Sequence, residues 1–170
     1  MDFKEKIRVI HDFPQPGVRF KDITTLLQDG ACYKAAIDQM ASELQGLNID
    51  LIAGPEARGF VVGAPLAYAL GTGFVPVRKA GKLPGEVVEA EYDLEYGKSK
   101  LAIHRDAIQP GQRVLIADDL LATGGTISTT VDLVERVGGE VVGVAFLIEL
   151  TYLNGRDKLG DHPIFTLVQY

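Results

Sequence analysis

The segment from Val114 to Thr126 combines residue types that are complementary to one class of ligand. It begins with four apolar residues, continues through Asp118 and Asp119, and ends in a loop rich in hydroxyl groups and glycine. An apolar strand followed by such a loop and a helix directs free backbone N–H groups and the positive end of a helix dipole toward a phosphate. The two carboxylates add acceptors for sugar hydroxyls or ligands for a hard metal ion. This combination indicates a phosphorylated sugar.

A purely structural interpretation of this segment is also open. Paired aspartates at the end of a strand can cap the following helix, and Gly124-Gly125 can form an ordinary tight turn. The binding interpretation therefore depends on two further polar loops.

The first of these loops, Gly54 to Phe60, follows an apolar run. Its two glycines are spaced as in a Walker A loop, but Phe60 stands where the phosphate-binding lysine is required, which disfavours a P-loop nucleotide hydrolase. Arg58 precedes a predicted helix and can bind a phosphate through two parallel hydrogen bonds. The alternative is that Arg58 forms a surface ion pair with Glu56.

The second loop, Arg78 to Gly85, places three cations beside two glycines and a proline. Such a charge run in isolation is typical of a solvated surface. Together the three loops predict a ligand with one phosphate near Thr123 to Thr126 and a denser anion near Arg58 and Lys82. So many anionic oxygens favour Mg²⁺ held through ligand oxygens rather than in an all-protein cage.

The remaining sequence predicts the elements that position these loops. Strands alternate with helices, which indicates an α/β fold with a central, mainly parallel sheet flanked by helices, and ligands bind beyond the carboxyl ends of such strands. Two alternating runs predict a β-hairpin. We expect helices over 2–10, 33–45, 59–70 and 127–137, central strands over 49–53, 74–78, 114–117 and 141–148, hairpin strands over 87–92 and 99–103, and an edge strand over 164–169.

Composition limits the classes of function. A length of 170 residues with 46% hydrophobic residues suits one domain, and a net charge of −6 argues against nucleic acid as a partner. A local cluster of cations can still bind a small anion. The single cysteine, Cys32, fits a reducing compartment, the charged segment from Met1 to Lys6 is unlike a signal peptide, and the apolar runs are too short to span a bilayer. We expect a cytoplasmic protein without a membrane partner.

The predicted ligand, a sugar with a phosphate at one end and a pyrophosphate at the other, is 5-phosphoribosyl-1-pyrophosphate. The segment from Val114 to Thr126 resembles the signature of the type I phosphoribosyltransferases. Two segments are more specific and resemble the members of that family that act on adenine, namely Arg78–Gly85 and Leu94–Lys98. The resemblance also includes Pro16–Ile23, Glu56–Phe60 and Leu167–Tyr170, so it covers essentially the whole chain.

This resemblance implies a fold and an activity. The fold is the type I phosphoribosyltransferase fold, a single domain over 1–170 with a small N-terminal hood at 1–30 and a flexible β-hairpin flap at 86–104. The activity is purine salvage, in which the 5-phosphoribosyl group is transferred from 5-phosphoribosyl-1-pyrophosphate to adenine, giving AMP and pyrophosphate. Mg²⁺ is the implied cofactor, and the implied assembly is a homodimer.

The resemblance also assigns residues to the phosphoribosyl donor. The 5′-phosphate would be held by the loop residues, and the ribose hydroxyls would meet Asp118 and Asp119, directly or through Mg²⁺. Arg58 would bind pyrophosphate in a loop with a non-proline cis peptide between Glu56 and Ala57. Further donor contacts would come from a basic loop shared across the dimer and from the flap. The full set is Ala122, Thr123, Gly124, Gly125, Thr126, Arg58, Arg78, Lys79, Lys82 and Tyr96.

Adenine would be recognised by Arg19, Phe20 and Lys21, with the Phe20 ring stacking on the purine, although the residue type alone equally suits a core aromatic. Glu95 on the flap would accept or relay a proton near N7 of the purine. The implied catalytic groups are thus Glu95, Asp118, Asp119 and Arg58.

Two other functions remain open. A related enzyme for 6-oxopurines would have a lysine near the end of the strand at 144–149, where this sequence has none. A regulator that senses the donor without consuming it would usually carry a nucleic-acid-binding segment or a basic face, and neither is evident.

Overall fold

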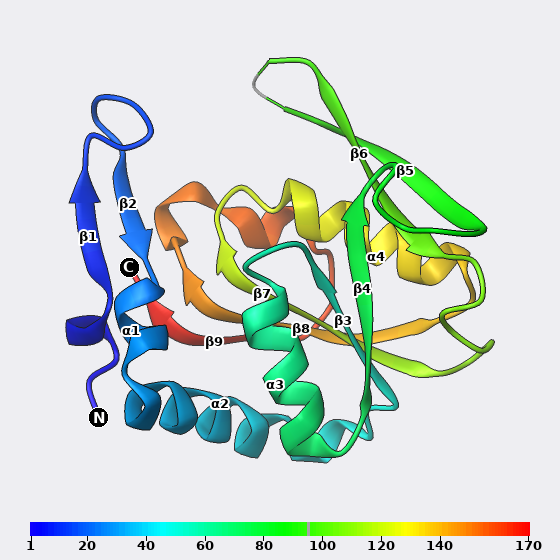
Figure 1. Ribbon diagram of the computed structural model, residues 1–170, viewed down its shortest axis with the longest axis horizontal. Helices are drawn as coiled ribbons and strands as arrows, with labels where there is room; N and C mark the ends of the chain where they lie inside the picture. Colours follow the sequence, from blue (N-terminus) through cyan, green and yellow to red (C-terminus); the bar gives the residue numbers. More distant parts are fainter. Residues whose placement is uncertain (95) are drawn as a thin grey trace.

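A seven-stranded sheet forms the centre of the computed structural model, which describes residues 1–94 and 96–170 (Figure 1). The strand order is β5-β6-β4-β3-β7-β8-β9, and the five strands from β4 to β9 in this order are parallel to one another. The predicted α/β fold with a mainly parallel sheet is confirmed. The parallel strands are β3 (Leu51–Pro55), β4 (Gly73–Lys79), β7 (Arg113–Leu121), β8 (Glu140–Glu149) and β9 (Ile164–Gln169).

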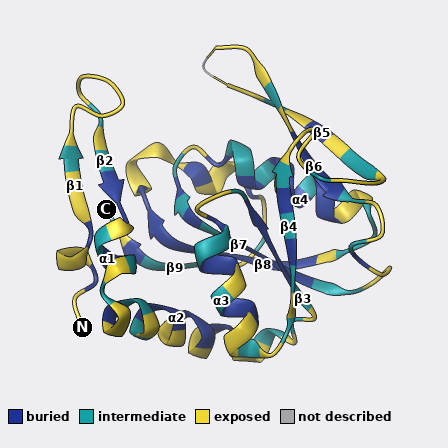
Figure 2. Cartoon of the chain, in the orientation of Figure 1, coloured by how far each residue is buried: buried dark blue, intermediate teal, exposed yellow. Residues whose placement is uncertain are grey.

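Helices cover both faces of this sheet, with α2 (Gly30–Leu44) and α3 (Phe60–Leu70) on one face and α4 (Gly125–Arg136) on the other (Figure 1). Leu115 and Ala117 of β7 pack with α2 and α3, whereas the alternating Ile116 packs with α4. Burial on both faces explains the continuous apolar runs within β3, β7 and β8 (Figure 2). Short 3₁₀ turns occur at Lys4–Lys6, Gln45–Leu47, Thr151–Leu153 and Gly155–Lys158.

The helices predicted over 33–45, 59–70 and 127–137 agree with the structure except at their ends. Helix α2 begins three residues earlier than expected, because the Asp29 side chain accepts a hydrogen bond from the N–H of Cys32 at 3.0 Å and caps the first turn. Helix α3 ends at Gly71, whose φ of +68° suits glycine. Among the described residues, no helix combines the length and the apolar character needed to cross a membrane.

Strand β7 is longer than the sequence predicts. It extends to Leu121 because its pairing with β8 continues past the apolar run, with Asp118 opposite Phe146 and Leu120 opposite Ile148. The predicted end of this strand at residue 117 is therefore too early, and Asp118 and Asp119 lie within the strand. The ladder of a central strand holds both carboxylates in place.

The N-terminal segment also differs from its prediction. The helix expected over 2–10 is absent, and β1 (Arg8–His11) instead pairs antiparallel with β2 (Arg19–Asp22) in a separate two-stranded sheet, which helix α1 (Thr24–Gln28) follows (Figure 1). The helical spacing of Phe3 and Ile7 arises because both side chains are buried. Long-range pairing with β2, a strand that the sequence did not reveal, overrides the local pattern.

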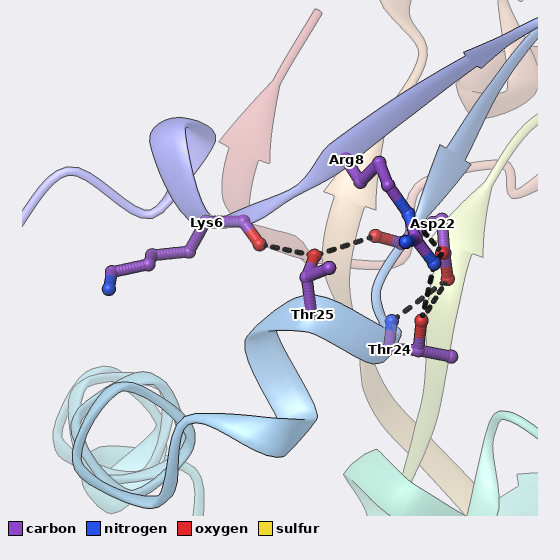
Figure 3. Close-up of polar contacts among 5 residues, drawn as sticks. All are labelled: Lys6, Arg8, Asp22, Thr24 and Thr25. Atoms are coloured by element: carbon purple, nitrogen blue, oxygen red, sulfur yellow. Dashed lines mark hydrogen bonds and ion pairs between the residues drawn. The ribbon is translucent and has the colours of Figure 1, made fainter.

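Asp22 anchors this small sheet to α1 (Figure 3). Its carboxylate accepts hydrogen bonds from the Thr24 hydroxyl at 2.7 Å, from the Thr24 N–H at 3.0 Å and from Arg8 Nε at 3.0 Å. The Thr25 hydroxyl donates to the Lys6 carbonyl at 2.7 Å. These bonds, led by those from Thr24, lower the pKa of Asp22 to about 2.

The predicted hairpin is present as β5 (Val87–Asp93) and β6 (Lys98–His104). Strand β6 pairs antiparallel with β4 at Arg78 and Lys79, and the hairpin extends beyond the layers of the domain (Figure 1). Tyr96 near its tip is exposed. Glu95, to which a catalytic role is assigned above, lies outside the described residues.

The lowered pKa of Asp22 makes the stability of the hood dependent on acid. Because ionised Asp22 is favoured in the folded state, its contribution is complete above its ordinary pKa of 3.8 and is lost as the pH falls toward about 2. We expect Asp22→Asn to lower the free energy of unfolding near neutral pH, with a difference from the wild type that shrinks across this range. Urea unfolding at several pH values measures that difference.

The matched control is Asp38→Asn, which removes an exposed carboxylate paired with Lys34 on α2. It should change stability little at any pH. A difference between Asp22→Asn and the wild type that stays constant from neutral pH down to about pH 2 would contradict the role given to Asp22.

Candidate active site

Loops at the carboxyl ends of neighbouring strands meet around a cavity of about 200 Å³. Arg58, from the segment after β3, faces the end of β7 and the N-terminus of α4, which contribute residues 118–127 to the lining. The structure thus brings together the carboxylate pair, the glycine-rich loop and Arg58, as the sequence predicts. Larger cavities lie between α2 and α3 and beside His104, but neither contains any of the predicted site residues.

The glycine-rich loop presents an uncapped helix N-terminus to this cavity. Gly124 stands at the N-cap of α4 with φ of +87° and has no side chain to cap the first turn, which favours binding of an anion by the N–H groups there. A Cβ on Gly124 would lie 2.5 Å from the Gly155 carbonyl oxygen, and one on Gly155 would lie 2.4 Å from that of Ala122. Close contact with Gly155 therefore sets the shape of the loop.

Sequence reasoning missed this second segment. Asn154-Gly155 is a typical turn pair, but nothing in the sequence shows that the turn packs against the glycine-rich loop. Lys158 was missed as well, and its ammonium group lies 4.0 Å from the position that a Cβ on Gly125 would occupy. It adds positive charge beside the N-terminus of α4.

Two adjacent carboxylates share the floor of the cavity. Asp118 accepts a hydrogen bond from the N–H of Asp119 at 2.8 Å, and Asp119 Oδ2 lies 3.1 Å from Arg58 Nε. Burial raises the pKa of Asp118, and the charge of Asp119 raises it further. Burial also raises the pKa of Asp119, although the Arg58 guanidinium opposes that effect.

These carboxylates have unused capacity to bind a ligand. Asp119 Oδ2 is buried and accepts no well-directed hydrogen bond from the described part of the chain. Such an oxygen suits a sugar hydroxyl or a hard cation such as Mg²⁺. Within residues 1–94 and 96–170 no three His, Cys, Asp or Glu residues form a metal-binding cluster, so a metal ion here would depend on ligand oxygens.

The expected alternative for Arg58, an ion pair with Glu56, is wrong. Glu56 instead accepts a hydrogen bond from the N–H of Lys79 at 2.7 Å and lies 3.3 Å from Arg78 Nε. Burial favours the neutral acid, but these two partners outweigh it and lower the pKa of Glu56. The peptide bond between Glu56 and Ala57 is cis, as the resemblance implies. Because Glu56 is engaged by Arg78 and Lys79, Arg58 pairs with Asp119 instead.

The other cations and the flap tyrosine do not line the cavity. The Arg78 side chain is held at Glu56, which Lys79 contacts only through its backbone N–H, and the side chains of Lys79 and Lys82 are exposed. Tyr96 is also exposed. The described part of one chain therefore brings Arg58, but not Arg78, Lys79, Lys82 or Tyr96, to the carboxylates.

The predicted base-recognition residues lie on β2, next to this site. The guanidinium carbon of Arg58 lies over the Phe20 ring, 5.3 Å from its centroid, and Phe13 contacts that ring edge-on. Phe20 is only partly buried, so the alternative of a core aromatic is wrong. Lys21 is buried above the ring of Tyr170, and burial lowers its pKa. Arg19 is exposed.

Known proteins resemble this chain over its whole length. A family model for the phosphoribosyl transferase domain matches residues 23–165. An adenine phosphoribosyltransferase of Brevibacillus brevis is 70% identical over 170 residues, which is 100% of both chains. The crystal structure of adenine phosphoribosyltransferase from Thermoanaerobacter pseudethanolicus matches with a TM-score of 0.97 and 55% identity, covering 99% of this chain and 98% of that chain.

A third relative shows what such a protein binds. The adenine phosphoribosyltransferase of Saccharomyces cerevisiae, complexed with adenine and an imino-altritol bisphosphate, has a TM-score of 0.94 and 40% identity, covering 98% of this chain and 96% of that chain.

The raised pKa of Asp118 predicts a cost in stability. The folded state holds the Asp118 proton more tightly than the unfolded state does, so the wild type loses stability as the pH rises from 3.8 through the raised pKa. Asp118→Asn removes that loss, so the ligand-free variant should be more stable than the wild type at neutral pH. Thermal unfolding from mildly acidic to neutral pH measures the effect.

The control is Asp132→Asn, which alters an exposed carboxylate of α4 that pairs with Arg136. Its stability should follow that of the wild type at every pH. Equal stability of Asp118→Asn and the wild type at neutral pH would contradict the raised pKa of Asp118.

Proposed function

This chain belongs to the adenine phosphoribosyltransferases within the phosphoribosyltransferase family, and we propose that it transfers the 5-phosphoribosyl group of 5-phosphoribosyl-1-pyrophosphate to adenine. The products are AMP and pyrophosphate, and the reaction salvages a purine. The observation that carries this proposal is one cavity in which the N-terminus of α4, the adjacent carboxylates of Asp118 and Asp119, and Arg58 meet.

We assign the 5′-phosphate to the loop from Ala122 to Thr126. The free N–H groups at the start of α4 support this role, since they are fixed in place before the ligand arrives. The hydroxyls of Thr123 and Thr126 and the backbone of Gly124 and Gly125 complete the binding site.

The ribose hydroxyls meet Asp118 and Asp119 in this proposal. Asp119 Oδ2 supports it, because this buried oxygen accepts no well-directed hydrogen bond from the described residues, and a hydroxyl or an Mg²⁺ ion would satisfy it. Mg²⁺, when bound, would neutralise charge on the leaving pyrophosphate. Asp118 and Asp119 would also tolerate the positive charge that develops on the ribose ring as the C1–oxygen bond breaks.

Pyrophosphate is assigned to Arg58 together with Arg78, Lys79, Lys82 and Tyr96. Of these five residues, only Arg58 lines the cavity in the described part of one chain. We therefore propose a homodimer in which the basic loop at 78–85 of one subunit serves the site of the other. This arrangement would add cations to the leaving group without placing them beside the carboxylates of their own chain.

Adenine is assigned to Arg19, Phe20 and Lys21, with the purine stacked on the Phe20 ring. The position of that ring beside Arg58 supports this assignment. In the reaction, a ring nitrogen of adenine forms a bond to C1 of the ribose. The bond between C1 and the pyrophosphate oxygen breaks, and its electrons leave with pyrophosphate. Glu95 accepts or relays the proton lost near N7 of the purine.

Three further assignments complete the proposal. The chain acts as one domain over 1–170, with a hood at 1–30 that recognises the base. The hairpin at 86–104 is a flap that excludes water from the reacting ribose. The protein works in the cytoplasm.

The test is to incubate the purified protein with Mg²⁺, the donor and each nucleobase separately, and then to identify the nucleotide formed. AMP should form with adenine, and no nucleotide should form at a comparable rate with hypoxanthine, guanine or uracil. Faster turnover of another base would assign the chain to that base. Binding of the donor without any product would favour the sensor.

We expect Asp119→Ala to fold and to lower turnover at least ~100-fold, because it removes one electrostatic contribution to the transition state. Glu95→Ala should have a similar effect through lost proton transfer. Steady-state kinetics measures both. Asp38→Ala, on the exposed face of α2, is the control and should retain the wild-type rate. A folded Asp119→Ala protein with wild-type turnover would contradict the assigned site.

A further inference from the structure

Arg58 makes two contacts that belong to different parts of the proposed reaction. Its Nε lies 3.1 Å from Asp119 Oδ2 in the donor cavity, and its guanidinium carbon lies 5.3 Å from the centroid of the Phe20 ring. Phe20 stands on β2 of the separate two-stranded sheet. One side chain therefore connects the hood to the floor of the donor site.

The position of Arg58 covers the surface on which a purine would stack. Arg58 also lines the cavity, so the ring face that it covers is the one next to a residue of the donor site. The Phe13 ring also packs against Phe20, with the ring centroids 5.2 Å apart and the ring planes at 79°. A flat base cannot lie against the covered face while the guanidinium occupies it.

Arg58 is free to leave this position. Its side chain is 46% exposed, and Asp119 is the only ion-pair partner that it has among the described residues. A guanidinium binds a phosphate or pyrophosphate through strong paired hydrogen bonds, whereas its attraction to an exposed aromatic ring is weak. A pyrophosphate group in the cavity would therefore draw Arg58 away from Phe20.

We propose that Arg58 couples the two substrate sites by covering the Phe20 ring until pyrophosphate draws it away. This inference rests on the proposed function, which supplies the two ligands, and it adds a positioning role to the anion-binding role of Arg58. By linkage, pyrophosphate must then raise the affinity for adenine by the same factor as adenine raises the affinity for pyrophosphate.

The size of the coupling follows from the contact that is lost. A cation–π contact at an exposed site is worth about 0.5–1 kcal/mol, which corresponds to about two- to fivefold in affinity. Adenine should therefore bind about two- to fivefold more tightly in saturating magnesium pyrophosphate than in its absence. Isothermal titration calorimetry measures both affinities on the wild-type protein.

The decisive variant is Phe20→Leu, which removes the ring and does not alter a group that would touch pyrophosphate. If the ring holds Arg58 back, Phe20→Leu should bind magnesium pyrophosphate about two- to fivefold more tightly than the wild type, even though it binds adenine less tightly. A merely structural role for Phe20 would leave the pyrophosphate affinity equal or reduced.

The matched control is Phe13→Leu, the same substitution in the neighbouring ring, which should leave the pyrophosphate affinity at the wild-type value. Circular dichroism establishes that each variant is folded. Unchanged or weaker pyrophosphate binding by folded Phe20→Leu would overturn the coupling, as would wild-type adenine binding that does not respond to pyrophosphate. If the wild type forms no AMP from adenine and the donor, the proposed function itself fails, which is a separate result.

Discussion

The contact between Arg58 and Asp119 is the interaction on which the site depends. Asp118 and Asp119 are adjacent in a central strand, and burial disfavours the ionised form of each. A buried carboxylate is tolerated only when a cation or hydrogen bonds offset its lost hydration. Arg58 supplies that charge from the neighbouring loop, although the Asp119 Oδ2 that it contacts accepts no well-directed hydrogen bond from the described residues.

The rest of the fold keeps these groups in place without blocking the cavity. The ladder between β7 and β8 fixes the carboxylates, and the close contact between Gly124 and Gly155 fixes the loop that begins α4. Glu56 holds Arg78 and the backbone of Lys79. Among Arg58, Arg78 and Lys79, only Arg58 faces the carboxylates. From this position it contacts both the anion cavity and the Phe20 ring of β2.

Local sequence patterns predicted the secondary structure correctly wherever a single helix, strand or hairpin determined it. The strand and helix around residues 114–136, the apolar strands and the hairpin all follow from patterns that lie within a dozen residues of one another. Local patterns failed at the N-terminus, where the spacing of Phe3 and Ile7 predicts a helix but pairing with β2 produces a strand. They also failed at Asp118, because a strand continues through charged residues when its neighbour still offers hydrogen bonds.

The sequence by itself determined the types of residue that can bind a phosphorylated sugar and the strands whose ends carry them. It did so because phosphate loops and parallel strands have patterns that are local in the chain. Only the tertiary structure decided that Arg58 pairs with Asp119 rather than Glu56, that Gly155 and Lys158 lie beside the glycine-rich loop, and that the Phe20 ring lies against Arg58. Each of these contacts joins segments far apart in sequence, so each depends on how the sheet and the hood pack, and local spacing does not contain that information.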